Sequence, residues 1–289
     1  MITRFAPSPT GPLHLGHAYS AILAHDMART NRGQFLLRIE DIDQSRSRTE
    51  WEELILEDLR WLGLTWDGPV VRQSERSPIY RTTIRGLWEQ NLLFACTCSR
   101  RDVLEAAFAP NEGTALFGPD GVIYPGTCRD GQSDWGRKPI PTDAALRLFM
   151  SRACFALRDH DRFSFEELNP FDPGVSDRIR FDDRDLAAKV GDVVLARRDM
   201  GTSYHLSVVT DDAEQGITHV IRGQDLFETT KIHVVLQRLL GLPTPTYHHH
   251  RLIRDDDGKR LAKRDDARAI RTYRDAGATP AEIRRMVGL

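Results

Sequence analysis

The sequence has 289 residues, 40% of them hydrophobic, which is enough for a large core in one large domain or two smaller ones. Forty lysines and arginines nearly balance 42 aspartates and glutamates, so the composition excludes a strongly basic nucleic-acid binder and limits any RNA contact to local basic patches. No run reaches the ~20 apolar residues of a membrane span, and the first residues show no signal or transit pattern, so we expect a cytoplasmic protein.

The first forty residues predict a β-loop-α-β unit. A short β-rich run at residues 2–5 leads into a proline-rich loop, and a helix is expected at about residues 18–30, with Gly33 as its left-handed C-cap. Residues 34–39 predict a buried strand that ends just before Glu40. Such a unit normally makes a right-handed crossover between two parallel strands.

The middle of the chain begins with two helices and then changes in character. Thr49 and Glu52 have capping-box spacing before a helix over residues 50–62, and a second helix is expected to begin at Ser77 and Pro78. Residues 96–140 hold three cysteines and many glycines, prolines and aspartates. This composition predicts an inserted module with little core of its own.

Regular patterns return toward the end. We expect strands at residues 204–209 and 218–222, then a helix through residues 232–240 that Gly241 ends. Thr279, followed by a proline and by a glutamate at the capping-box position, predicts a short last helix.

These elements predict an α/β fold with a Rossmann-type parallel sheet that an inserted module divides. The expected boundaries are listed in chain order. They are residues 1–91 for the first half of the nucleotide-binding domain, 92–184 for the inserted module, 185–245 for the second half, and 246–289 for a loop and a short helical tail.

Two segments carry groups suited to phosphate. His14-Leu15-Gly16-His17 stands where a loop meets a helix, and there free backbone N–H groups and the helix dipole favour an anion. Gly16 permits a close approach, and the two imidazoles can donate hydrogen bonds as charge builds on a phosphate. A cation-rich segment, 258–264, follows late in the chain. Taken singly, the alternatives are incidental histidines in a surface loop and a solvated run of charge.

In their order along most of residues 1–265, these segments resemble the class I aminoacyl-tRNA synthetases of the glutamyl subgroup. His14-Leu15-Gly16-His17 stands in place of the family's His-Ile-Gly-His signature, after Arg4-Phe5-Ala6-Pro7-Ser8-Pro9-Thr10-Gly11. Ile221-Arg222-Gly223-Gln224-Asp225-Leu226 resembles its Arg-Gly-Glu-Asp segment, and Arg260-Leu261-Ala262-Lys263-Arg264 stands in place of its Lys-Met-Ser-Lys-Ser loop. Arg260 and Ala262 depart from that loop pattern, which keeps the charge and loses a hydroxyl. The resemblance implies activation of glutamate as glutamyl-adenylate, with ATP and Mg(II) as substrate.

The resemblance also implies roles for individual residues. An arginine can clamp a carboxylate in two-pronged fashion, and an anion suits the substrate ammonium. A buried arginine that needs an anion would make glutamine a poor substitute. The implied glutamate-binding residues are Arg4, Phe5, Ala6, Pro7, Ser8, Glu40, Tyr204 and Arg222. Among them, Glu40 is expected to bind the ammonium and Arg222 the side-chain carboxylate. The implied ATP-binding residues are His14, Gly16, His17, Asp225, Arg260 and Lys263, and the catalytic ones among them are His14, His17 and Lys263.

Cys96, Cys98, Tyr124 and Cys128 resemble a structural zinc site found in one branch of this family. Thiolates suit tetrahedral Zn(II), and a metal stabilises most where the core is small. The alternative is a set of buried free thiols. Cys154 stands outside the pattern and is expected in the core.

About 25 residues follow Arg264, too few for the anticodon-binding domain of full glutamyl-tRNA synthetases. The short form with this cysteine pattern resembles the branch that activates glutamate without tRNA and transfers it to queuosine in the anticodon of tRNA(Asp). Two other interpretations stay open: a truncated enzyme that charges a tRNA 3' end, and a non-catalytic tRNA-binding homologue. We expect a monomer with no membrane contact.

Overall fold

Parallel strands form the centre of the molecule. The computed structural model describes the chain except residues 109–116, 130–134, 159–162, 170–171 and 255–267. One sheet has the order β1-β2-β3 and the other the order β11-β12-β8-β9, in which only the edge strand β9 is antiparallel. The strands are β1 (Ile2–Phe5), β2 (Gln34–Ile39), β3 (Val71–Arg72), β8 (Ser164–Asn169), β9 (Asp172–Arg180), β11 (His219–Gly223) and β12 (Thr246–His250).

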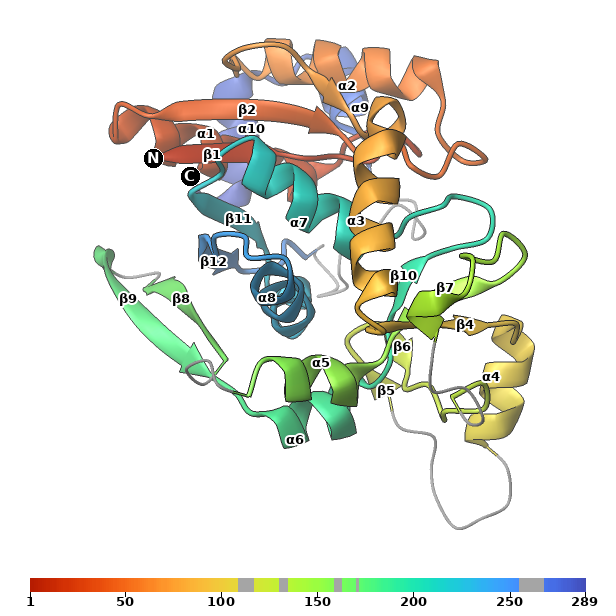
Figure 1. Ribbon diagram of the computed structural model, residues 1–289. Helices are drawn as coiled ribbons and strands as arrows, with labels where there is room; N and C mark the ends of the chain where they lie inside the picture. Colours follow the sequence, from red (N-terminus) through yellow and green to blue (C-terminus); the bar gives the residue numbers. More distant parts are fainter. Residues whose placement is uncertain (109–116, 130–134, 159–162, 170–171, 255–267) are drawn as a thin grey trace.

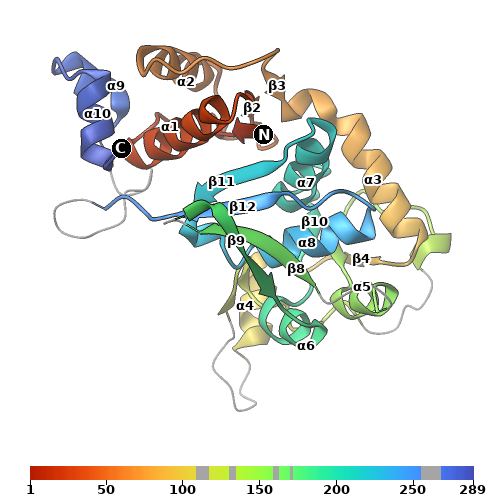
Figure 2. The same cartoon turned by 90° about the vertical axis from the view of Figure 1, so that its left-hand side faces the viewer.

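Hydrogen bonds between Thr218, which precedes β11, and Ile2 of β1 connect the two sheets edge to edge. The Thr218 N–H donates to the carbonyl oxygen of Ile2 at 3.0 Å, and the Thr218 hydroxyl accepts from the Ile2 N–H at 2.8 Å. Figures 1 and 2 show β1 beside β11, so that the strands continue as one layer. The predicted crossover between parallel strands at the start of the chain is confirmed by the pairing of β1 with β2.

Helices cover both faces of this layer. Ile221 belongs to a core under α1 (Leu15–Thr30), and its neighbour Val220 belongs to the core with α7 (Tyr204–Glu214) and α8 (Thr230–Leu239), as expected for side chains that alternate along a strand. The last helix, α10 (Pro280–Val287), packs on α1 and carries the predicted capping box (Figure 2). Among the described residues, no helix combines the length and the apolar character that crossing a lipid bilayer requires.

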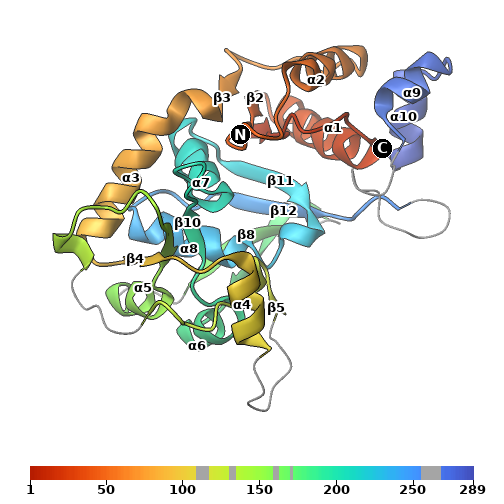
Figure 3. The ribbon, with the colours of Figure 1, turned by 90° about the vertical axis from the view of Figure 1, so that its right-hand side faces the viewer.

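A smaller unit carries Cys96, Cys98 and Cys128. The helix α3 (Ser77–Glu89) begins at the predicted serine and runs from the parallel sheet to an antiparallel sheet of β4 (Leu93–Cys96), β7 (Ala145–Leu148) and β10 (Val194–Ala196) (Figure 1). Figure 3 shows this unit from the side of α4 (Arg100–Ala107). Its separate core consists of Phe94, Cys96, Val103 and Tyr124. A core this small fits the predicted module, whose boundaries stay a prediction.

The other elements in the described part of the chain are shorter or peripheral. They are α2 (Thr49–Trp61), β5 (Phe117–Gly118), β6 (Gly121–Val122), α5 (Met150–Ala156), α6 (Asp183–Asp185), α9 (Ile270–Asp275) and the short helical turns η1 (Gln73–Arg76), η2 (Trp135–Arg137), η3 (Leu186–Val190) and η4 (Gln224–Leu226).

The strand predicted at residues 204–209 is wrong, because these residues begin the helix α7. Ser203 caps this helix by accepting from the Leu206 N–H. Residues 205–212 of α7 are all buried, so no polar face reveals the helical period, and the β-branched valines favour a strand in the pattern.

Two predicted caps also differ. Gly33 is not left-handed; Arg32 takes that conformation, with φ of 50°. Gly33 is needed for space instead, since a Cβ there would lie 2.0 Å from the Met1 carbonyl oxygen. The capping box at Thr49 does not form, because α2 already includes this residue and Arg48 precedes it without a side-chain cap.

Candidate active site

A cleft of about 490 Å³ lies where β1, β2 and β11 end, the edge at which α/β sheets bind ligands. We call it the first cleft. All candidate glutamate and ATP residues that the structure describes line it: Arg4, Phe5, Ala6, Pro7, Ser8, His14, Gly16, His17, Glu40, Tyr204, Arg222 and Asp225. Arg260 and Lys263 lie outside the described residues.

The two signature histidines cap the first turn of α1. Nδ1 of His14 accepts from the Gly16 N–H at 3.1 Å, and Nδ1 of His17 accepts from the His14 N–H at 3.2 Å. Each neutral ring therefore carries its proton on Nε2. These two backbone N–H groups, expected to be free for phosphate, are used within the turn. The donors that the turn would present to a phosphate are the imidazole Nε2–H groups.

Arg222 is a buried cation held by uncharged partners, with only 5% of the residue exposed. Its Nε donates to Nε2 of His249 at 3.1 Å, its Nη1 to Nδ1 of His233 at 3.1 Å, and its Nη2 to the Thr230 hydroxyl at 2.6 Å. None of these partners is a carboxylate. A buried charge is costly unless an opposite charge pairs with it, so this position favours an anionic ligand.

A network of buried charges reaches the first cleft through Arg4 and Glu40. Asp212 pairs with Arg4 at 3.0 Å and with the fully buried Arg38 at 2.8 Å. Arg38 also pairs with Glu40 at 3.2 Å. Burial would raise the pKa of Asp212, but Arg4 and Arg38 bring it below its usual value. Because Arg4 directs Nε and Nη2 at Asp212, the expected two-pronged clamp on a substrate is not available through these nitrogens.

Burial raises the pKa of Glu40 despite the nearby Arg38 and Arg4. Its side chain is only 9% exposed. A carboxylate whose charge is opposed by burial gains most from a cation that enters the site. This property suits the expected contact of Glu40 with a substrate ammonium.

Sequence reasoning missed several polar residues at this site. Arg38, Asp212 and His233 were not among the candidates, and neither was His250, which lines the first cleft 2.6 Å from the Ser20 hydroxyl. Burial lowers the pKa of His250 to about 4. Two signals were available: a charged residue inside the apolar run of β2, and three successive histidines at the end of β12.

The described residues that flank segment 255–267 lie near the histidine turn. Ile253 lines the first cleft on one side of the segment. On the other side, Ala269 forms an antiparallel bridge with His14, and the Ile270 N–H donates to the carbonyl oxygen of Leu13 at 2.8 Å. The described residues on the two sides of the predicted lysine-bearing loop therefore lie at the first cleft and at His14.

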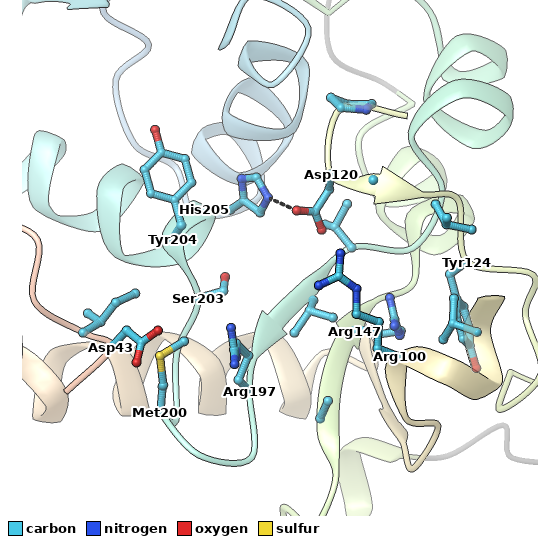
Figure 4. A pocket seen from close by; sticks show the side chains of 18 of the residues that line it. Asp43, Arg100, Asp120, Tyr124, Arg147, Arg197, Met200, Ser203, Tyr204 and His205 are labelled. Atoms are coloured by element: carbon cyan, nitrogen blue, oxygen red, sulfur yellow. Dashed lines mark ion pairs between the residues drawn. The ribbon is translucent and has the colours of Figure 1, made fainter. Parts of the chain in front are cut away.

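A second cleft, of about 1130 Å³, adjoins the first and shares Ser8, Glu40 and Tyr204 with it. Figure 4 shows Arg100, Arg147 and Arg197 around it, with Tyr204 to one side and His205 next to Asp120. The arginines that line it are Arg46, Arg100, Arg147, Arg197 and Arg198. Five acidic residues line it as well, namely Glu40, Asp43, Asp120, Asp192 and Asp199, so the lining is mixed in charge, and its arginines are the groups that could contact RNA phosphates.

The three predicted cysteines and the tyrosine meet in the small core. The sulfur atoms of Cys96, Cys98 and Cys128 lie within 4.8 Å of one another. The Tyr124 hydroxyl lies 3.5 Å from the first sulfur and 3.8 Å from the second. Burial opposes charge on Cys128, but hydrogen bonds with Tyr124 and Cys98 lower its pKa to about 6. Cys154 is buried away from this group in α5, as predicted.

Comparisons with known proteins agree with this geometry. Residues 1–108 and 162–289 match the model of the catalytic domain of class I tRNA synthetases (E and Q). A glutamyl-Q tRNA(Asp) synthetase of Rhodobacter capsulatus is 62% identical over the full length of both chains. That of Nocardia farcinica is 41% identical and is aligned over 97% of this chain and 81% of its own.

Solved structures show the same fold. A glutamate tRNA ligase of Elizabethkingia meningosepticum, solved in complex with its amino acid, has a TM-score of 0.75 at 26% identity, and the present chain spans 60% of its length. A methionyl-tRNA synthetase of Mycobacterium tuberculosis shares the fold at 10% identity with a TM-score of 0.58, over 99% of this chain and 63% of its own.

Proposed function

Because the chain belongs to the class I tRNA synthetases of the glutamyl and glutaminyl type, and among them to the glutamyl-Q tRNA(Asp) synthetases, we propose that it activates glutamate with ATP and transfers it to queuosine in tRNA(Asp). One observation carries the proposal. The first cleft combines Arg222, a buried cation that has no carboxylate partner among the described residues, with the turn of His14 and His17. A carboxylate substrate and a phosphate can therefore be bound side by side.

In the first step, an oxygen of the glutamate α-carboxylate attacks the α-phosphorus of ATP, and the bond to the β-phosphate breaks as pyrophosphate leaves. We assign Arg222 to the side-chain carboxylate and Glu40 to the ammonium of glutamate. The Nε2–H groups of His14 and His17 donate to phosphate oxygens as negative charge builds on them. Mg(II), which enters with ATP, supplies neutralising charge on the phosphates.

In the second step, a hydroxyl of the acceptor attacks the carbonyl carbon of the mixed anhydride. The bond from this carbon to the phosphate oxygen breaks, and AMP leaves while the hydroxyl gives up its proton. We propose that the hydroxyl belongs to the cyclopentenediol ring of queuosine. The second cleft supports this step, because its arginines can pair with RNA phosphates and it shares Tyr204 with the first cleft.

Two assays test the function. We expect ATP-pyrophosphate exchange with glutamate in the absence of tRNA, and transfer of labelled glutamate to tRNA(Asp) that contains queuosine but not to tRNA(Asp) that lacks it. Labelling of the 3' end of unmodified tRNA would support a truncated charging enzyme instead. Absence of exchange would support a non-catalytic homologue. The cytoplasmic location predicted from the sequence is part of the proposal.

We also propose that Cys96, Cys98, Cys128 and Tyr124 hold a structural Zn(II). The residues fit the ion because the three sulfur atoms lie within 4.8 Å of one another, the phenolic oxygen is 3.5 and 3.8 Å from two of them, and four such ligands satisfy tetrahedral zinc. Their core is small, so a metal would supply much of the stability of this unit. Zinc serves here as a structural ion and takes no part in the two chemical steps.

Metal analysis should find about one zinc ion per chain, and Cys98→Ser should lose most of it because a structural site needs all four ligands. The matched control is Cys154→Ser, which removes a buried thiol outside the cluster and should keep the zinc. If Cys98→Ser retained the same zinc content as Cys154→Ser, the assignment would be wrong.

A further inference from the structure

Hydrogen bonds lead from Arg222 away from the first cleft to Asp120, between β5 and β6. Nη1 of Arg222 is 3.1 Å from Nδ1 of His233 on α8. Nε2 of His233 is 3.3 Å from Nδ1 of His205 on α7. Nε2 of His205 is 3.2 Å from Oδ1 of Asp120, the contact drawn in Figure 4. Asp120 lines the second cleft, so the chain of contacts joins the walls of the two clefts.

Arg222 fixes the direction of every hydrogen bond in this chain. A guanidinium can only donate, so Nδ1 of His233 accepts and its proton lies on Nε2. That proton is donated to His205, whose own proton then lies on Nε2 and is donated to the Asp120 carboxylate. Burial and the charge of Arg222 hold the pKa of His233 well below its usual range. The neutral ring that this order requires is therefore the stable form.

Asp120 stabilises one tautomer of both histidines. Without an acceptor at this end, His205 can carry its proton on Nδ1, which faces Nε2 of His233 and favours a proton on Nδ1 of His233. That proton would point at the N–H of Arg222, and the two donors would repel each other. Water cannot easily replace these contacts, because His233 is 1% and His205 is 5% exposed.

We propose that His233, His205 and Asp120 are positioning residues that hold the Arg222 guanidinium for the side-chain carboxylate of glutamate. The proposal rests on the function assigned to Arg222 above. It places one determinant of amino-acid specificity on the wall of the second cleft, at a side chain that is 44% exposed. Asp120 thereby acts on amino-acid binding without touching the amino acid.

The test compares variants in ATP-pyrophosphate exchange without tRNA, with the KM for glutamate and the KM for ATP measured separately. We expect His205→Ala to raise the glutamate KM about tenfold and Asp120→Ala about threefold or more, with less than about twofold change in the ATP KM. Asp120→Asn keeps an oxygen that accepts from His205, so it should restore the glutamate KM to within about twofold of wild type. Asp185→Ala is the matched control, because Asp185 is ion-paired with Lys189 and does not line either cleft.

Asp120 is partly exposed, so its variants report on the chain even if His205→Ala does not fold. The proposal is overturned if Asp120→Ala keeps the wild-type KM for glutamate while Arg222→Lys raises it strongly, or if Asp120→Ala changes the glutamate and ATP values equally. If Arg222→Lys itself leaves the glutamate KM unchanged, the function assigned to Arg222 fails, and the positioning chain with it.

Discussion

Lys263→Ala should slow the formation of glutamyl-adenylate by about 100- to 1,000-fold, with less than about a threefold change in glutamate affinity. The reason is that negative charge on the leaving pyrophosphate grows only as the reaction proceeds, so a cation that contacts it stabilises the transition state more than the bound substrates. Lys263 lies outside the described residues. The flanks of its segment are next to the signature histidines, where Ala269 pairs with His14.

Pyrophosphate exchange at saturating and limiting glutamate separates the rate from the affinity. The matched control is Lys259→Ala, which removes another cation of the same segment that has no assigned role and should keep the rate within about threefold. A variant Lys263→Ala that bound glutamate far more weakly but turned over at the wild-type rate would rule out the transition-state role.

The strands near the chain start were predictable because local pattern and tertiary structure agree there. Residues 34–39 form a short run that is mostly apolar, and a buried parallel strand needs both properties. The helix α8 was predictable for a similar reason, since its apolar residues recur at helical spacing and Gly241, with φ of 64°, ends it.

The helix α7 was not predictable in this way, because it is buried on all sides. His205, Asp211 and Asp212 are polar residues within a buried helix, and their partners lie on β1, β2, α8 and other distant segments. Nothing in the local sequence indicates these partners. The same reason explains why residues named from the signature segments line the first cleft, whereas the buried polar residues behind them were not among the candidates.

Glu40 and Arg38 illustrate the difference. Glu40 was predictable as a site residue because it follows a buried strand at the carboxyl end of the sheet. Arg38 lies two residues earlier and faces the same side of the strand, yet its function depends on Asp212, which is 174 residues away in sequence. Pairing over such a distance follows from the fold and not from spacing.

Asp212→Ala should lower the free energy of unfolding by about 3–5 kcal/mol, because it removes the carboxylate that two buried arginines share. Arg38 is fully buried and Arg4 is 5% exposed, so neither can turn to water to replace the lost partner. Glutamate binding should weaken as well, since Arg4 and Glu40 both line the first cleft and both belong to this network. Urea unfolding at pH 7, followed by circular dichroism, measures the first effect.

Asp26→Ala is the matched control. Asp26 also binds one arginine through both oxygens, at 2.5 and 3.1 Å from Arg284, but its side chain is 39% exposed, so the loss should be about 0–1 kcal/mol. Asp212→Asn keeps the shape and removes the charge, and should fall between the two. If Asp212→Ala and Asp26→Ala lowered the free energy of unfolding equally, ion pairing with Glu40 and Asp211 would be sufficient to stabilise the buried Arg38. In that case Asp212 would not be the residue that holds Arg4 and Glu40 in position in the lining of the first cleft.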